Sequence, residues 1–426
     1  LGLCYELGRG VDENKEHAVE LYRQSAEQGY AYAQCNLGFC YLHGIGVEAD
    51  DGQAVMWLER AAAQNSARAL DLLGDCAADG TGMDQDDEKA AAYYRRAAEM
   101  NYLPALVSLG LRYENGRGVD ADPAQALALY ERAGERGEPA GACNAGYCYL
   151  HGIGTRPDPE RAVAWLKRAA EQDHPRALYL LGVCYFDGTG VEQSVEEAVA
   201  YYRRGAEGNY APALAGLGYC YEMGRGVPED KEKAVEYYRQ GAERGYAYAQ
   251  CNLGRCLFHG IGTEQNLAKG VEWLYKAADQ GDNEARYLLG RYRVLGERIT
   301  KDTREGESLL RAAAESGHTA AQYYLGTLYM NGDRLRRDER MAAALFAKAA
   351  EKDHGPSLFL LGECYAQGRG VPKDVEKAAR LYQKAANLGE WDAAHALKKL
   401  KEERAQGPSP RKAGGLRGLF QKLKGQ

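Results

Sequence analysis

Three kinds of signal are missing from this sequence, and each absence excludes a class of protein. No apolar run approaches the roughly 20 residues that a membrane-spanning helix needs. Positive charge is not in excess, because the formal net charge is -7, so nucleic acid is not an expected partner. No Gly-Lys-Ser/Thr motif, His-x3-His pair or Cys-x2-Cys pair occurs, so the sequence predicts no phosphate loop, no metal site and no cofactor.

Phenylalanine and isoleucine, which usually fill protein cores, are scarce. The chain has 6 phenylalanines against 31 tyrosines and 52 glycines. Small residues let helices approach closely, and tyrosine rings fill the space between them. The composition therefore indicates a core of closely packed helices.

The 11 cysteines do not indicate a disulfide framework. Their number is odd and most of them recur at one position of a repeat, so we expect small, buried, unpaired thiols. Unpaired cysteines favour a cytoplasmic location. The repeated position is occupied by Cys4, Cys40, Cys76, Cys148, Cys184, Cys220, Cys256 and Cys364.

One phrase, seen at Leu37–Val47 as LGFCYLHGIGV, returns along nearly the whole chain. Its glycine recurs at intervals of 36 residues without a slip, which indicates one elongated array of repeats instead of several globular domains. The recurring glycines are Gly2, Gly38, Gly74, Gly110, Gly146, Gly182, Gly218, Gly254, Gly290, Gly326 and Gly362.

Each repeat predicts two helices, which we call A and B. In the first full unit Asn14 is an N-cap residue, and helix B follows from Lys15 to Gln28. Helix A is expected from Ala31 to His43, with Gly44 as a left-handed terminator. A glycine inside helix A costs about 1 kcal/mol relative to alanine, so we expect Gly38 to mark a close contact between helices. Leu1 corresponds to the middle of a helix A, so we expect a truncated start.

A longer period of 108 residues lies on top of the first. Trp57, for example, returns as Trp165 and Trp273. We expect three-repeat blocks at 1–108, 109–216 and 217–324, followed by divergent repeats. A polar capping helix at 398–404 is expected to end the array, which has about eleven repeats and spans 1–404.

The last segment, 405–426, is predicted to be a basic linker and tail. Its apolar residues follow the spacing of a short amphipathic helix, which would contact a partner or an anionic membrane, and a solvated tail is the alternative. These residues are Leu416, Leu419, Phe420 and Leu423.

The repeat resembles the SEL-one-like repeat (SLR), a relative of the tetratricopeptide repeat. The matching positions in the first unit are Tyr5, Gly8, Gly10, Val11, Ala18, Tyr22, Ala26, Glu27 and Gly29. The resemblance implies an all-α fold, a right-handed α/α solenoid of antiparallel helix pairs whose A helices line the concave side. It also implies a non-enzymatic scaffold or adaptor for another protein, with roles such as signalling. One cysteine-rich branch has been linked to β-lactam binding, and because its cysteine spacing is not found here, a ligand-binding or hydrolase-type member is only the alternative.

Cys35, Asn36 and His43 suggest a thiol hydrolase, but eight residues of helix separate Cys35 from His43 by about 12 Å, so no catalytic residue is predicted. The exposed side of the A helices is the expected site for a partner protein or peptide. Leu3 and Leu111 lie on this side as well. The candidate groove residues are Asn36, Phe39, Leu42, His43, Asn144, Tyr147, Leu150, His151, Phe186, Tyr219, Asn252, Phe258 and His259.

Overall fold

The computed structural model describes residues 1–296 and 298–405, and every regular element in this part of the chain is an α-helix. The odd-numbered helices are the A helices of the repeats: α1 (Gly2–Leu7), α3 (Ala31–His43), α5 (Ala67–Asp79), α7 (Leu103–Asn115), α9 (Pro139–His151), α11 (Pro175–Asp187), α13 (Ala211–Met223), α15 (Ala247–His259), α17 (Asn283–Leu295), α19 (Thr319–Asn331), α21 (Gly355–Gln367) and α23 (Trp391–Ala405).

The even-numbered helices are the B helices. They are α2 (Lys15–Glu27), α4 (Asp51–Ala63), α6 (Asp87–Glu99), α8 (Pro123–Glu135), α10 (Pro159–Ala170), α12 (Val195–Glu207), α14 (Lys231–Glu243), α16 (Leu267–Asp279), α18 (Thr303–Glu315), α20 (Glu339–Ala350) and α22 (Val375–Asn387). The predicted alternation of A and B helices is confirmed, and the boundaries expected in the first unit agree with α2 and α3 to within a residue.

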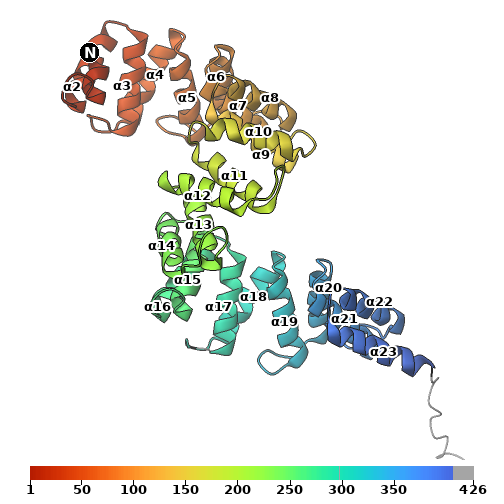
Figure 1. Ribbon diagram of the computed structural model, residues 1–426. Coiled ribbons are helices and arrows are strands. Elements are labelled where there is room, and N and C mark those ends of the chain that lie inside the picture. Colours follow the sequence, from red (N-terminus) through yellow and green to blue (C-terminus); the bar gives the residue numbers. More distant parts are fainter. Residues whose placement is uncertain (297, 406–426) are drawn as a thin grey trace, which may run out of the picture. The chain divides into compact units, whose positions relative to one another are not determined.

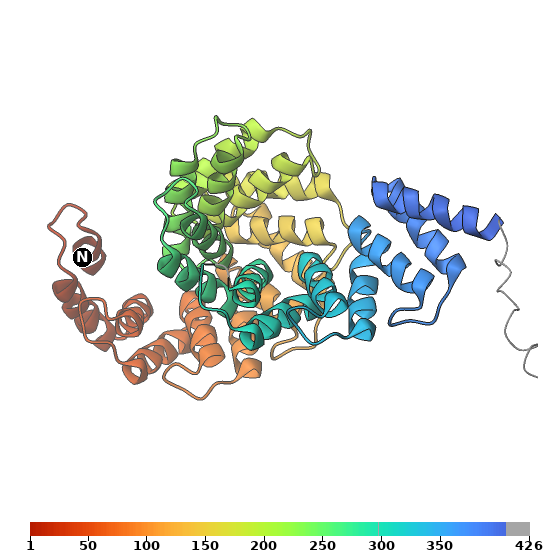
Figure 2. The same cartoon turned by 90° about the horizontal axis from the view of Figure 1, so that it is seen from below.

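The chain divides into unit 1, Leu1–Tyr237, and unit 2, Tyr238–Gln426. Within unit 1, from α1 to α13, each helix packs against the next one along the chain. Neighbouring A helices also touch directly, as α3 does with α5 and α5 with α7. This is solenoid-like packing, and the helix pairs of unit 1 follow a curved path (Figures 1 and 2). Consecutive helices pack in the same way from α15 to α23 of unit 2.

Every full-length B helix begins at a side-chain cap, as the sequence predicts. The cap oxygen accepts the backbone N–H three residues later at 2.8–3.2 Å, which pairs one of the free donors of the first turn. The caps are Asn14, Asp50, Asp86, Asp122, Asp158, Ser194, Asp230, Asn266, Asp302, Asp338 and Asp374.

The glycine inside an A helix marks a close contact with the following B helix wherever its surroundings are described, as the sequence predicts. A Cβ atom on Gly38 would lie 2.7 Å from Leu58 Cγ, and one on Gly74 would lie 2.4 Å from Tyr94 Cε1. Both distances are too short for a real Cβ contact. The same 20-residue spacing joins Gly110 to the ring of Tyr130. The absence of a side chain on these glycines therefore leaves room for a side chain of helix B.

Alanine, leucine, tyrosine and cysteine form the core between the helices. The rings of Tyr94 and Tyr130 are 2% and 0% exposed, and Ala54 and Leu58 are fully buried. None of the eleven cysteines forms a disulfide, and all except the half-buried Cys4 are buried, as expected from their spacing. Within residues 1–296 and 298–405, no helix is both long enough and apolar enough to cross a membrane.

Two irregular segments near the C-terminal end differ from the other repeats. The loop after α19, like the loop after α17, has arginine in place of the second glycine of the motif, and it buries Leu335, which is 6% exposed. The charged segment expected as a separate capping helix is the second half of α23, which runs without a break from Trp391 to Ala405. Helix A and the charged segment are thus one helix.

Candidate functional site

The structure does not bring Cys35 and His43 together as a nucleophile and base would require. Both lie on α3, where Cys35 is 2% exposed and His43 is exposed with its ring 4.3 Å from that of Phe39. Burial raises the pKa of the Cys35 thiol, and raises that of Cys143, the matching cysteine of the second block, to about 12. An activated cysteine needs a lowered pKa, so these thiols have the properties of core residues.

The side chains described by the structure do not form a cluster of three or more His, Cys, Asp or Glu residues suited to a metal ion.

Most of the predicted groove residues lie at the surface of the A helices, half-buried or exposed. Phe39, Leu42, Asn144, Tyr147, Leu150, Phe186, Tyr219 and Asn252 are half-buried, whereas His43, His151 and His259 are exposed. The nine of these in unit 1 we call the A-helix surface: Phe39, Leu42, His43, Asn144, Tyr147, Leu150, His151, Phe186 and Tyr219.

Two predicted groove residues are buried, and the expectation that they are exposed was wrong. Phe258 is 1% exposed because its ring stacks on that of Tyr292, with centroids 4.0 Å apart. Gly270 on α16 permits this, since a Cβ there would lie 2.8 Å from the backbone nitrogen of Phe258. Asn36 is 5% exposed, and its Nδ2 has no hydrogen-bond partner among the described residues.

Two arginines next to this surface were not anticipated from the sequence. Arg68, in the first turn of α5, donates from Nη1 to Asn36 Oδ1 at 2.8 Å, and its Cζ lies 4.8 Å from the centre of the Phe39 ring. Arg176, 108 residues later in α11, donates to Asn144 Oδ1 at 3.1 Å, with Cζ 4.5 Å from the Tyr147 ring. The 108-residue spacing was the available signal, because it relates Arg68 to Arg176 as it relates the asparagines.

The third block has a different arrangement at the same positions. Glu284 replaces the arginine, and His318 Nε2 lies 3.0 Å from its Oε2. Arg255 replaces the aromatic ring and donates to Asn252 Oδ1 at 3.2 Å, while His259 Nε2 lies 2.7 Å from Tyr292 Oη. The block duplication therefore preserved the asparagine but not the charge around it.

A buried acid lies on α5, three residues after Arg68. Asp71 on α5 is 8% exposed, and its Oδ1 has no hydrogen-bond partner among the described residues. Burial, together with the neighbouring Asp75, raises the pKa of Asp71 to about 7, although a hydrogen bond with Ser108 opposes the shift. Asp75 itself accepts a hydrogen bond from Tyr94 Oη at 2.7 Å.

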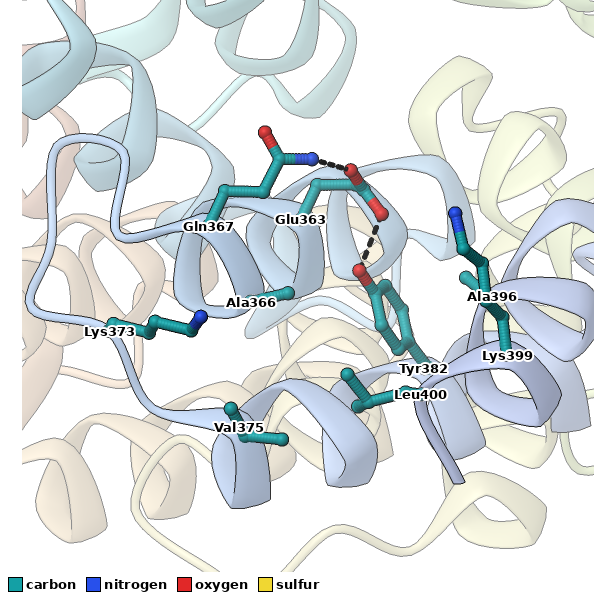
Figure 3. Close-up of a pocket in the computed structure, with 9 residues that line it drawn as sticks. All are labelled: Glu363, Ala366, Gln367, Lys373, Val375, Tyr382, Ala396, Lys399 and Leu400. Carbon is teal, nitrogen blue, oxygen red and sulfur yellow. Dashed lines mark hydrogen bonds between the residues drawn. The ribbon is translucent and has the colours of Figure 1, made fainter. Parts of the chain in front are cut away.

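A cavity of about 390 Å³ lies among α21, α22 and α23 of unit 2, away from the predicted residues (Figure 3). Glu363 on one wall accepts hydrogen bonds from Gln367 and, at 2.5 Å, from Tyr382 Oη. Lys373 and Lys399 line the same cavity. Both hydrogen bonds of the Glu363 carboxylate are therefore made within the wall of the cavity.

The predicted tail residues Leu416, Leu419, Phe420 and Leu423 lie outside the described residues.

A model of the Sel1 repeat matches eleven consecutive segments: residues 1–30, 31–66, 67–102, 103–138, 139–174, 175–210, 211–246, 247–282, 283–318, 319–354 and 355–390. The chain belongs to the Sel1 repeat family. Members of this family typically mediate protein interactions and are typically non-catalytic. The expected resemblance and the all-α repeat fold are thereby confirmed.

Solved structures of other Sel1 repeat proteins are similar to this chain. One is c5321, described as a protective antigen present in uropathogenic Escherichia coli strains and displaying an SLR fold, with 33% identity, coverage of 90% of this chain and 82% of that chain, and a TM-score of 0.61. Another is a Sel1 repeat protein from Oxalobacter formigenes, with 32% identity, coverage of 72% and 90%, and a TM-score of 0.54. A search of curated proteins found no match.

Proposed function

We propose that this Sel1 repeat protein is a non-enzymatic scaffold that binds a partner protein or peptide through the A-helix surface. The observation that carries the proposal is the chemistry of this surface. Phe39, Leu42, Tyr147 and Leu150 keep part of their apolar area in contact with water, at matching positions of two blocks. Covering apolar and aromatic groups of this kind with a partner is favourable, because it removes apolar surface from water.

The polar neighbours of these residues add directionality. His43 and His151 are exposed beside the rings of Phe39 and Tyr147, at 4.3 Å between ring centroids in both blocks. Imidazole groups both donate and accept hydrogen bonds, so they suit a partner with exposed backbone groups. Because the pattern returns after 108 residues, one partner can meet two similar patches.

The test uses the full chain with four substitutions: Phe39→Gln, Leu42→Gln, Tyr147→Gln and Leu150→Gln. Partners captured from a native extract are identified and purified, and their affinity for the wild-type and substituted chains is measured by calorimetry. We expect the affinity to fall by about tenfold or more, because loss of one or two anchor residues commonly has this effect.

The matched control substitutes two exposed apolar residues outside the A helices, Met100→Gln and Met341→Gln, which are 43% and 41% exposed. These should leave the affinity unchanged. Circular dichroism confirms that both variants remain folded. If the fourfold variant is folded and binds every purified partner as tightly as the control does, the proposal is wrong.

A further inference from the structure

The two arginines beside the A-helix surface are held in fixed positions by the same pair of contacts. An asparagine carbonyl oxygen accepts one N–H of each guanidinium, and an aromatic ring covers one face of it. Such contacts limit the rotation of a long side chain, so that less conformational entropy is lost when it binds a ligand. Arg68 and Arg176 are both half-buried, which leaves part of each guanidinium accessible.

Neither arginine has a charged partner within salt-bridge distance among the described residues, and neither forms a second hydrogen bond there. A guanidinium carries five N–H donors, so most of them remain available in each case. Two A helices earlier, on α1 and α7, the acids at matching positions are already engaged, since Glu6 accepts from Tyr22 Oη at 2.5 Å and Glu114 accepts from Tyr130 Oη at 2.7 Å.

A second, independent observation at the first site points to a ligand. Asn36 is only 5% exposed, and its amide Nδ2 lacks a hydrogen-bond partner among the described residues. An unpaired buried donor costs free energy, and because Asn36 Nδ2 has almost no exposed surface, a ligand oxygen recovers that cost only when the side chain turns to meet it. The donor belongs to the same side chain that holds Arg68 through its Oδ1.

The fold does not require an arginine at this place. The third block has Glu284 at the matching position, and its helices α15, α16 and α17 still form and pack in order. The arginine and its aromatic ring are therefore features of the first two blocks, both of which contribute these residues within unit 1.

We infer that Arg68 and Arg176 are two carboxylate-binding sites for one acidic segment of the partner protein, an inference that rests on the proposed function. The guanidinium fork matches the two oxygens of a carboxylate. A single arginine at each site balances the single negative charge of a carboxylate, whereas a doubly charged phosphate generally requires more cations. Leu111 on α7 lies between the two sites along the chain and is 44% exposed. It therefore favours an apolar residue between the two acids of the partner segment.

The spacing of the acids follows from the packing. The two sites are three repeats apart, and neighbouring helix axes lie about 8–10 Å from each other, so the separation is roughly 24–30 Å. An extended chain covers about 3.3 Å per residue, so the two acidic residues should be about eight residues apart.

The experiment uses the full chain, immobilised, and a pooled library of peptides about twelve residues long with two glutamates about eight residues apart and neutral residues elsewhere. A second library carries glutamine in place of both glutamates, and a third carries phosphoserine. The variants are Arg68→Gln, Arg176→Gln and, as a matched control, Arg60→Gln. Arg60 lies on helix B with its Cζ 4.5 Å from the Trp57 ring, so it is also stacked on an aromatic residue.

We expect the wild-type chain and Arg60→Gln to retain the glutamate library at least about tenfold over the glutamine library, and each of the other variants to lose most of this preference. Equal retention of the glutamate and glutamine libraries, or a preference that survives in Arg68→Gln and Arg176→Gln, would overturn the inference. Stronger retention of phosphoserine would overturn the assignment to carboxylates.

The inference and the proposed function can fail separately. If a purified partner loses affinity when Leu42 and Leu150 are substituted but binds Arg68→Gln and Arg176→Gln normally, the scaffold function stands and the carboxylate sites do not. Circular dichroism of each variant shows whether the fold is intact.

Discussion

Asp71 should make the stability of unit 1 depend on pH in a direction opposite to that of most acidic residues. Its pKa rises from the ordinary 3.8 to about 7 because the carboxyl group is buried and Asp75 is near. The folded chain therefore binds a proton between these two values that the unfolded chain releases. Stability falls as the pH rises from about 4 to about 7, and the loss is complete above pH 7.

The size of the effect follows from the shift. A rise of about three in the pKa corresponds to a loss of about 4 kcal/mol in the free energy of unfolding, at about 1.36 kcal/mol for each pKa unit. This is an upper value, because a water molecule beside the unpaired Oδ1 would reduce it. Asp71→Asn removes the charge and keeps the shape of the side chain. We expect this variant to be about 2–4 kcal/mol more stable than the wild type at pH 8 and nearly equal to it at pH 4.

The assay is urea denaturation followed by circular dichroism at pH 4, 6 and 8, with the carboxyl group titrated by carbon NMR in parallel. Asp79→Asn, at the exposed end of the same helix, controls for the general effect of removing one negative charge. A stability difference between wild type and Asp71→Asn that is the same at all three pH values would refute the reasoning, whatever its size.

Two further predictions concern the packing and capping of the repeats. Gly74→Ala should destabilise the chain by about 1–3 kcal/mol because the new Cβ would lie 2.4 Å from Tyr94 Cε1. Gly52→Ala, at an exposed position of α4 where a Cβ has no neighbour closer than 3.4 Å, should stabilise the chain by up to about 1 kcal/mol. Equal urea midpoints for the two variants would contradict this. His174 caps α11 by accepting the N–H of Ala177 at its Nδ1, and burial lowers its pKa. The folded chain then binds fewer protons than the unfolded chain, so stability is lost as the pH falls below about 6.5. His174→Asn keeps the cap without titrating, so its free energy of unfolding in urea should depend less on pH over this range. An unchanged pH profile would show that the cap does not titrate.

Much of the fold could be predicted from local sequence signals. An N-cap side chain acts on the three residues after it, so Asp50 or Asp122 sets the start of a helix regardless of distant contacts. A left-handed glycine such as Gly44, with φ of 64°, ends a helix for an equally local reason. The strict 36-residue interval then extends each local conclusion to every unit.

The candidate site was predicted less completely. The exposed face of helix A was inferred from spacing alone, and this fails when a neighbouring residue changes the packing. Phe258 is buried because Gly270 allows α15 to lie close to α16, and no periodicity of α15 by itself reports the residue at 270. Arg68 and Arg176 were missed because their partners lie 32 residues earlier in the chain, on the preceding A helix.

The sequence by itself determined the repeat length, the helix boundaries and the buried position of the cysteines, because caps, turns and apolar periodicity act within a few residues. Only the tertiary structure decided which side chains of helix A reach solvent, which arginines lack a charged partner, and that Asp71 carries a raised pKa. Those properties depend on what the neighbouring repeats place around each group. Burial and electrostatic energy are sums over these neighbours, and the spacing along one helix does not contain them.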